Sequence, residues 1–245
     1  SRNSVPRRTD QTPMTPLARA SHRARVLLER ALDVLAPRGC AACDALVDDG
    51  APFCASCRAT VGGPRESSLA GAPVFAGAAY GGALAAAVQR FKYRGRAELA
   101  PALTSLVEAA TPRGWRAEGA LLVPVPLHPA RLAERGYNQS ALLAGRLARR
   151  IGGASAPLAL ARTRATEQQA GRAPDARVEN VSGAFVARTP ERLRGRRVVL
   201  VDDVVTTGAT ARACAEALSE SGARLTAIMA VALAGLNEGA GGDDR

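Results

Sequence analysis

Short apolar runs recur along the chain, and segments with apolar residues at helical spacing separate them. Apolar runs of this length without alternation are typical of strands that are buried on both faces. The pattern predicts extended segments or strands over 74–80, 120–126, 157–161, 182–187, 196–203 and 224–234. It predicts helices over 24–36, 82–92, 97–110, 139–150 and 209–221. Strands that alternate with helices indicate an α/β fold, with a mostly parallel sheet flanked by helices on both faces.

The two ends of the chain lack this periodicity. Residues 1–23 are polar and punctuated by proline, and we expect them and a tail over 236–245 to be disordered. A Gly-, Pro- and Ser-rich stretch over 62–73 indicates a linker or a hairpin. It follows a small module over 24–62 and leads into a larger domain over 73–235, which is long enough to bury a core of its own.

Composition excludes some classes of protein and leaves others open. No apolar run approaches the roughly 18 residues that a membrane span needs, and no apolar export segment follows the first arginines, so we expect a cytoplasmic protein. The net charge of +11 is typical of proteins that bind nucleic acid, membrane surfaces or phosphorylated ligands. However, Lys92 is the one lysine among 33 basic residues, and such an arginine bias also fits a GC-rich genome. A nucleic-acid surface and a merely solvated basic face are both open.

Four of the five cysteines form two CxxC pairs with ten residues between them: Cys40, Cys43, Cys54 and Cys57. Each pair can present two thiolates from one turn, and two such turns complete a tetrahedral site that suits Zn²⁺. We expect a miniature zinc ribbon whose metal is structural, because four thiolates leave no open coordination position. Two local disulfides, a redox-active pair or four unrelated thiols are the alternatives. Cys214 lies apart, and we expect it to be a small core residue.

The segment VVLVDDVVTTGAT, residues 198–210, leads from an apolar strand into a helix. Free amides at a helix N-terminus favour a phosphate, and Gly208 permits close approach of the backbone. The paired carboxylates of Asp202 and Asp203 can accept hydrogen bonds from a vicinal diol. Acids and loop together fit the hydroxyls and the 5′-phosphate of one ribose phosphate. The pattern is neither GxGxxG nor a Walker loop.

This segment resembles the motif with which type I phosphoribosyltransferases bind 5-phosphoribosyl 1-diphosphate (PRPP). Two further stretches, VPVPLHPARLAERGYNQSALLAGRLA (123–148) and RTRATEQQAGRAPDARVENVSGAF (162–185), follow the cysteine pairs. Together these features resemble the ComF family, which is linked to competence and DNA uptake. The resemblance covers roughly residues 35–235. It implies a type I phosphoribosyltransferase fold with a small N-terminal zinc-ribbon module.

The resemblance implies roles for the residues of the motif. Asp202 and Asp203 would be the catalytic pair that holds the ribose 2′- and 3′-hydroxyls. The 5′-phosphate would be bound by the loop residues Thr206, Thr207, Gly208, Ala209 and Thr210. Mg²⁺ would accompany PRPP and neutralise the charge of its diphosphate.

Three cations outside the motif complete the predicted site. Arg131 follows the proline-rich strand at the position where the family binds pyrophosphate. Lys92 is a candidate ligand because it keeps a compact charge in a chain that otherwise uses arginine. Arg172 lies in the stretch over 162–180, which would form a hood over the ligand; the alternative is an ordinary surface loop. We expect His128 to face solvent and not to act as a base.

We therefore expect a protein that binds PRPP and transfers its phosphoribosyl group, with Mg²⁺ and with release of pyrophosphate. The alternative is a non-catalytic accessory protein in DNA uptake, which binds single-stranded DNA or a helicase-like partner. A third possibility is a regulator that senses PRPP without turnover. The intact acid pair and threonine–glycine loop favour ligand binding, but they do not name the acceptor of the phosphoribosyl group.

Overall fold

The computed structural model describes residues 39–47, 51–164 and 183–235. The predictions for 1–23, 24–36, most of 162–180 and 236–245 lie outside the described residues. The described elements are, in chain order, α2 (Ala55–Arg58), β1 (Arg65–Leu69), β2 (Ala72–Ala79), α3 (Gly82–Tyr93), η1 (Ala97–Leu99), α4 (Ala100–Ala110), β3 (Leu121–Pro124), α5 (Pro129–Arg135), α6 (Gln139–Ile151), β4 (Ala154–Ser155), β5 (Leu160–Arg162), β6 (Phe185–Ala187), α8 (Pro190–Leu193), β7 (Arg197–Val205), α9 (Ala209–Glu220) and β8 (Arg224–Leu233).

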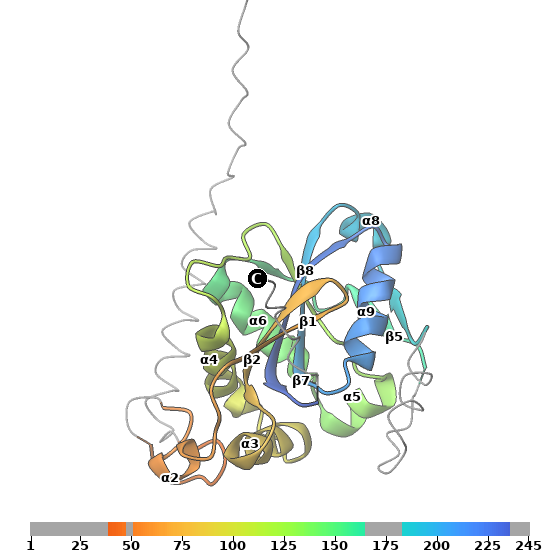
Figure 1. The fold of residues 1–245 in the computed structure, drawn as a ribbon. Coiled ribbons are helices and arrows are strands. Elements are labelled where there is room, and N and C mark those ends of the chain that lie inside the picture. Colours follow the sequence, from red (N-terminus) through yellow and green to blue (C-terminus); the bar gives the residue numbers. More distant parts are fainter. Residues whose placement is uncertain (1–38, 48–50, 165–182, 236–245) are drawn as a thin grey trace, which may run out of the picture. The chain divides into compact units, whose positions relative to one another are not determined.

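A six-stranded sheet lies at the centre, with the strand order β1-β2-β8-β7-β3-β4 (Figure 1). β1 pairs antiparallel with β2, and the other neighbouring strands are parallel. The predicted α/β fold with a mostly parallel sheet is therefore confirmed. The apolar run at 198–201 fills the middle of the sheet, where each of its side chains is at most 1% exposed. A central strand with helices on both faces buries every side chain, which is why this run does not alternate with polar residues.

The side chains of β7 alternate between two hydrophobic cores. Val199 and Val201 belong to the cluster that includes the inner faces of α3, α4 and α6. Val198 and Leu200 belong to the cluster that includes α9. Figure 1 shows α4 and α6 on one side of the sheet and α9 on the other. The same alternation continues into the acid pair and sends its two side chains to opposite faces.

The structure specifies the prediction for residues 62–73 and corrects the predicted strand over 157–161. The stretch over 62–73 forms a hairpin, since β1 and β2 pair across a turn at Ala70 and Gly71, whose φ angles are 51° and 74°. The predicted strand over 157–161 is misplaced: the edge of the main sheet is the two-residue strand β4. β5 begins later, at Leu160, and pairs antiparallel with β6 in a separate two-stranded sheet.

The carboxyl ends of β3 and β7 form the point where the connections diverge. The chain leaves β3 toward β4 on one side, and it leaves β7 toward β8 on the other. In open α/β sheets, ligands bind outside the carboxyl ends of strands at such a switch point. β7 runs on to Val205, two residues beyond the predicted range of 196–203, so Asp202 and Asp203 lie inside the strand and not at its end.

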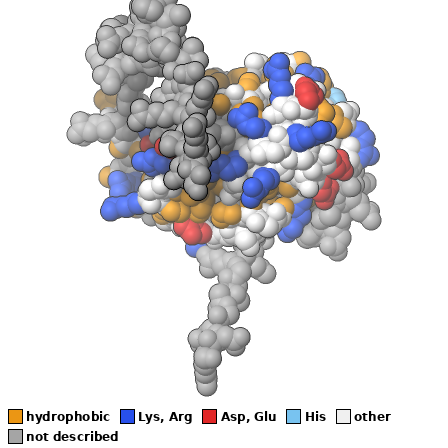
Figure 2. Space-filling view, turned by 90° about the horizontal axis from the view of Figure 1, so that it is seen from above, with side chains coloured by type: hydrophobic (Ala, Val, Ile, Leu, Met, Phe, Trp, Pro, Cys, Tyr) orange, Lys and Arg blue, Asp and Glu red, His pale blue; other side chains and the backbone are white. Residues whose placement is uncertain are grey.

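Basic side chains are spread over the face shown in Figure 2, with acidic and apolar side chains among them. None of the helices in the described part of the chain has the length and apolar character that crossing a bilayer requires.

Candidate functional site

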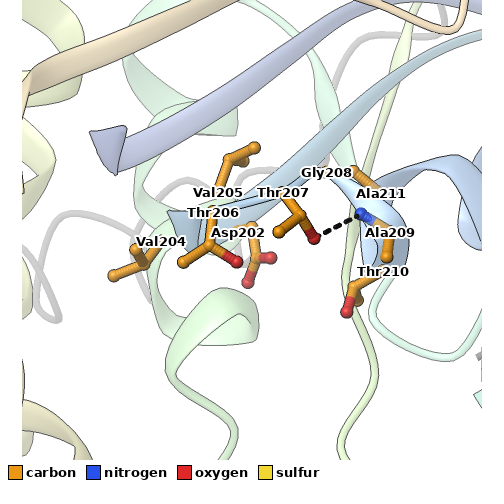
Figure 3. A pocket seen from close by; sticks show the side chains of 9 residues that line it. All are labelled: Asp202, Val204, Val205, Thr206, Thr207, Gly208, Ala209, Thr210 and Ala211. Carbon is orange, nitrogen blue, oxygen red and sulfur yellow. Dashed lines mark hydrogen bonds between the residues drawn. The ribbon is translucent and has the colours of Figure 1, made fainter. Parts of the chain in front are cut away.

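A pocket lies at the carboxyl end of β7, where the strand turns into α9 (Figure 3). Its lining consists of Asp202, Val204, Val205, Thr206, Thr207, Gly208, Ala209, Thr210 and Ala211. The structure thus brings one predicted acid and the whole predicted phosphate loop together around one hollow. Asp203 is not part of this lining, because its side chain points to the other face of the sheet.

The Asp202 carboxylate is buried and held by two donors. Its Oδ1 accepts hydrogen bonds from Ser140 Oγ, at 3.1 Å, and from the backbone N–H of Asp203, at 2.8 Å. Burial raises the pKa of Asp202 to about 7, and the charge of Asp203 adds to the rise. Lys92 and the two hydrogen bonds oppose it. A carboxyl group that titrates near neutral pH can change its charge when a ligand or a cation binds.

Asp203 forms an ion pair with Lys92, at 2.9 Å between Oδ1 and Nζ. The Lys92 side chain is 19% exposed and that of Asp203 9%. Burial alone would lower the pKa of the Lys92 ammonium, but the Asp203 carboxylate outweighs burial and raises this pKa above its usual value. The lysine reaches this carboxylate from the last turn of α3, far from β7 in the sequence. In the absence of a ligand, Lys92 therefore neutralises one of the two acids.

The loop between β7 and α9 depends on Gly208. This residue is the N-cap of α9 and has a φ of 79°, a left-handed conformation that suits glycine. A Cβ at this position would lie 2.8 Å from a methyl group of Leu69. The Thr207 hydroxyl accepts a hydrogen bond from the N–H of Ala209, at 3.4 Å (Figure 3). The exposed Thr206 and the first-turn amides of the twelve-residue helix α9 complete a surface that suits an anion.

The two described arginines of interest lie in different elements. Arg131 lies in α5, which follows β3, and Arg162 is the last residue of β5. Burial lowers the pKa of Arg162, the charge of Arg131 adds to this effect, and the charge of Asp202 opposes it. Arg162 is thus near enough to both Arg131 and Asp202 to feel their charges. The predicted ligand Arg172 lies outside the described residues.

Sequence reasoning missed two residues that contact or influence the acid pair. Ser140 donates directly to Asp202, and its signal was a polar residue on the buried face of the helix that begins at Gln139. Arg162 was hidden among many arginines of a biased composition. His128 acts locally, since its Nδ1 accepts a hydrogen bond from Ala130 N as the N-cap of α5. Cys214 is fully buried, as expected for a core residue.

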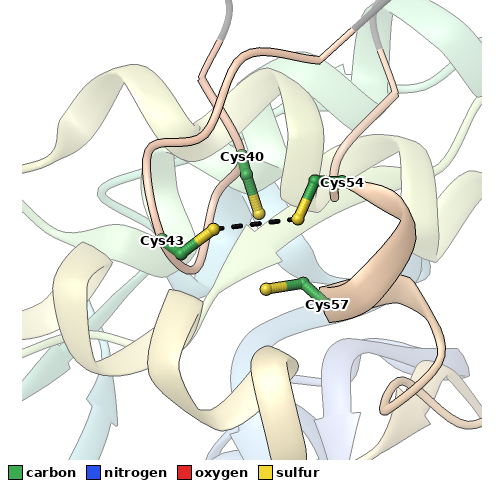
Figure 4. Close-up of side chains that lie close together, drawn as sticks. All are labelled: Cys40, Cys43, Cys54 and Cys57. Carbon is green, nitrogen blue, oxygen red and sulfur yellow. Dashed lines mark hydrogen bonds between the residues drawn. The ribbon is translucent and has the colours of Figure 1, made fainter.

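The four CxxC cysteines converge in a separate cluster (Figure 4). Their sulfur atoms all lie within 4.8 Å of one another, and those of Cys43 and Cys54 are 3.7 Å apart. A tetrahedral ion with bonds of about 2.3 Å places its sulfur ligands roughly 3.8 Å apart, so the cluster fits a metal such as Zn²⁺. The described cysteines form no disulfide, and the alternative of two local disulfides is not what the structure shows.

The charges of the thiols also fit a cation. The Ser56 hydroxyl, 3.3 Å from the sulfur, lowers the pKa of Cys54 to about 6. The neighbouring sulfur of Cys43 raises the pKa of Cys57 to about 12, because one thiolate disfavours the next. A divalent cation among the four sulfurs removes this repulsion and allows all four to ionise.

Comparison with known proteins finds the kind of domain that the motifs predict. Residues 138–243 match the phosphoribosyl transferase domain. The DNA utilization protein YhgH of Escherichia coli K12 is 37% identical over 148 residues, which are 59% of this chain and 64% of that protein. Competence protein F of Haemophilus influenzae is 33% identical over 140 residues, 55% of this chain and 61% of that protein.

Competence protein ComFC of Bacillus subtilis is 33% identical over 135 residues, 55% of this chain and 53% of that protein. In each of these three comparisons, the match covers less than two thirds of the relative's length.

Proposed function

We propose that this chain is a ComF-type protein with a phosphoribosyltransferase domain and that it binds PRPP at the carboxyl ends of β3 and β7. It transfers the phosphoribosyl group to an acceptor and releases pyrophosphate. One observation carries the proposal: a buried acid pair lies beside a threonine–glycine loop that opens a helix, and Asp202 and the loop line one pocket. A ribose 5-phosphate offers hydroxyls to the acids and a phosphate to the loop.

Each end of the ligand has its own partners in this proposal. Asp202 and Asp203 accept hydrogen bonds from the ribose hydroxyls, and the ion pair with Lys92 holds the Asp203 carboxylate in place. The 5-phosphate is bound by the hydroxyls and amides of Thr206–Thr210. The diphosphate at the other end of the sugar meets Arg131 and Arg162, and the predicted ligand Arg172 lies outside the described residues.

The reaction breaks the bond between C1 of the ribose and the diphosphate oxygen. The electron pair of that bond leaves with pyrophosphate, while C1 acquires the positive charge of an oxocarbenium-like transition state. The acceptor donates an electron pair to C1 and loses its proton. The chain's residues hold the sugar, stabilise the leaving group with guanidinium groups and exclude water. Mg²⁺, when bound with PRPP, supplies further neutralisation of the diphosphate charge beside the acid pair.

Titration calorimetry with PRPP and Mg²⁺ tests the binding site. We expect binding by the wild type and a loss of at least about tenfold in Asp202→Ala and Asp203→Ala, since each removes a charged acceptor. Glu216→Gln, an exposed acid on the same α9 helix, is the matched control and should bind as the wild type does. An absence of wild-type binding at millimolar PRPP would contradict the proposal.

Release of pyrophosphate tests the transfer itself. A panel of nucleobases and amines with PRPP and Mg²⁺ should include one acceptor that makes pyrophosphate release faster than with PRPP alone. Binding without accelerated release by any acceptor would instead support a sensor of PRPP. The zinc assignment is tested by metal analysis, in which a Cys→Ser change at any of the four cysteines should lower the bound zinc.

A second candidate function, binding of single-stranded DNA, rests on one surface feature. The Tyr93 ring is 51% exposed, and the Arg135 guanidinium lies over it at 4.6 Å from the ring centre. Exposed aromatic rings with arginines beside them stack nucleobases without regard to sequence. A gel shift with single-stranded DNA at low salt tests this function, and Tyr93→Ala should weaken the shift. No shift by the wild type would exclude it.

A further inference from the structure

Both CxxC turns of the cysteine cluster are connected to the same helix, α3, by hydrogen bonds. The second turn holds its beginning: Thr60 Oγ1 donates to the carbonyl of Cys57, at 2.8 Å, and accepts from the N–H of Ala83, at 3.0 Å. Gly82 allows this approach, because a Cβ there would lie 2.4 Å from the Thr60 carbonyl oxygen. One hydroxyl therefore joins the backbone of a metal-site cysteine to the first turn of α3.

The first CxxC turn holds the other half of α3. Arg90 Nη1 donates to the carbonyl of Ala41, at 3.2 Å, and the same guanidinium pairs with Asp44. Arg96, just beyond the helix, also pairs with Asp44, at 2.8 Å. Asp44 is half exposed, so its ion pairs alone stabilise little. The buried contact is stronger, since Cys40, Ala41 and Phe53 belong to the same core cluster as the inner face of α3.

The end of α3 reaches the acid pair by two routes. Lys92 pairs directly with Asp203. One residue earlier, the carbonyl of Phe91 accepts hydrogen bonds from the Tyr137 hydroxyl and, at 3.5 Å, from Gln139 Nε2. Gln139 is followed by Ser140, which donates to Asp202. A shift of α3 would therefore disturb the partners of both carboxylates.

We infer that the cysteine cluster positions the sugar-binding acids through α3, so that metal binding by the cysteines and ligand binding by the acids favour each other. The metal joins the two CxxC turns, the turns fix both ends of α3, and α3 fixes Lys92 against Asp203. Thr60 and Asp44 are positioning residues in this chain of contacts. The inference rests on the proposed binding of PRPP. Coupling between two sites is reciprocal, so PRPP must also slow the loss of the metal.

Two substitutions loosen α3 without touching the cysteines or the acids. Thr60→Val removes both hydrogen bonds and keeps the shape of the side chain, and Asp44→Asn removes the charge that pairs with Arg90 and Arg96. Their matched controls are Arg58→Gln and Glu66→Gln, exposed residues of the same region. Metal analysis and a melting curve establish that each variant is zinc-loaded and folded before its ligand affinity is measured.

Calorimetry with PRPP and Mg²⁺ should show affinity at least about fivefold weaker in Thr60→Val, with a smaller loss in Asp44→Asn that Asp44→Glu restores. In a Lys92→Met background the effect of Thr60→Val should be smaller, because one of the two routes from α3 to the acids runs through the Lys92–Asp203 ion pair. Hydrogen exchange of the α3 amides should be faster in Thr60→Val than in its control. Release of zinc to a chelator should be slower with PRPP than without it.

The two proposals fail in different ways. If the wild type binds no PRPP, the proposed function is wrong and this inference is wrong with it. If the wild type binds PRPP and the zinc-loaded Thr60→Val binds it equally well, the inference alone is wrong. An unchanged rate of zinc release with PRPP would contradict it in the same way.

Discussion

At the scale of the single residue, burial and ligand binding place opposite demands on the charge of Asp202. Its carboxylate is buried, which disfavours the charge, and the proposed ligand needs that charge. The pKa of about 7 in the folded protein lies above the usual 3.8, so the folded protein keeps a proton that the unfolded chain releases between these values. The free energy of unfolding should therefore fall as the pH rises from about 4 to about 7.

Asp202→Asn should remove this loss of stability, because an amide keeps an acceptor oxygen for Ser140 and the N–H of Asp203 but carries no charge. We expect unfolding at pH 8 to cost on the order of 1–2 kcal/mol more in the variant, and the difference to shrink toward pH 5. PRPP affinity should fall roughly tenfold or more. Denaturant unfolding at both pH values measures the first effect, and a variant less stable than the wild type at pH 8 would contradict it.

Replacing Lys92 should have the opposite effect on stability from replacing Asp202, because it leaves the buried Asp203 carboxylate without its cation. Lys92→Met should destabilise the fold by roughly 3 kcal/mol, and the double variant with Asp203→Asn should recover most of that loss. The double variant should not regain PRPP affinity with its stability, since it lacks the charge of Asp203 that serves the ligand. Arg94→Met, an exposed neighbour, is the control and should change stability by less than about 0.5 kcal/mol. Additive losses in the double variant would show that the two residues are not coupled.

The site residues that are contiguous in the chain could be predicted from the sequence. Asp202, Asp203 and Thr206–Thr210 form one pattern of strand, acids and helix start, and local chemistry is enough to recognise it. The pairing of Lys92 with Asp203 depends on how α3 packs against the sheet, which no local pattern contains. Ser140 could not be assigned for the same reason, because a polar residue near a helix start is more often a local partner of the backbone.

At the scale of elements, the turn from β7 into α9 is the most constrained segment of the site. Gly208→Ala should destabilise the protein by roughly 1–3 kcal/mol, since alanine meets both a φ of 79° and the Leu69 side chain. The phosphate loop should shift with it, so PRPP affinity should also fall. Adding Leu69→Ala relieves the contact but not the backbone strain, and it should not restore PRPP affinity.

Gly145 in α6 is the matched control for this change, because a Cβ there has nothing within 4 Å. Gly145→Ala should stabilise the protein by about 0.5–1 kcal/mol, the usual gain in a helix interior. Melting temperatures of the three variants measure both effects. A neutral Gly208→Ala would show that the loop tolerates another conformation.

The elements that sequence patterns predicted well are long and strongly apolar. β7 and β8 lie in the centre of the sheet. Because both of their faces are buried, successive positions are apolar and form a continuous run in the sequence. β4 has two residues, both exposed, so the edge of the sheet leaves no such run. The apolar run over 157–161 instead contains the exposed Leu158 and only the start of β5. A short strand at an edge is defined by its neighbour and not by its own residues.

At the scale of the whole molecule, the acid pair lies where the two cores meet. Asp202 accepts from Ser140 of α6 and lines a pocket with the start of α9, and Asp203 pairs with Lys92 of α3. One ligand bound by both carboxylates would therefore be sensitive to the packing of both layers. The cysteine cluster contacts the layer of α3, which gives these residues outside the pocket a physical route to the partners of both acids.

Net charge is also a property of the whole molecule, and it separates the two candidate functions. The charge of +11 predicts that any binding of single-stranded DNA weakens steeply with salt, by a slope of about −0.7 for each phosphate neutralised. Arg94→Gln should make that slope shallower, whereas Tyr93→Ala should lower DNA affinity about five- to a hundredfold at every salt concentration, because stacking does not depend on counterions.

PRPP affinity should stay unchanged in Tyr93→Ala and be lost in Asp202→Asn, while DNA affinity should show the reverse. Fluorescence anisotropy with labelled single-stranded DNA at several salt concentrations, next to calorimetry with PRPP, measures both ligands on the same variants. A loss of both affinities in Tyr93→Ala would show that the two ligands share one surface. The exposed ring would then belong to the proposed phosphoribosyl site itself, and both ligands would compete for the same pocket.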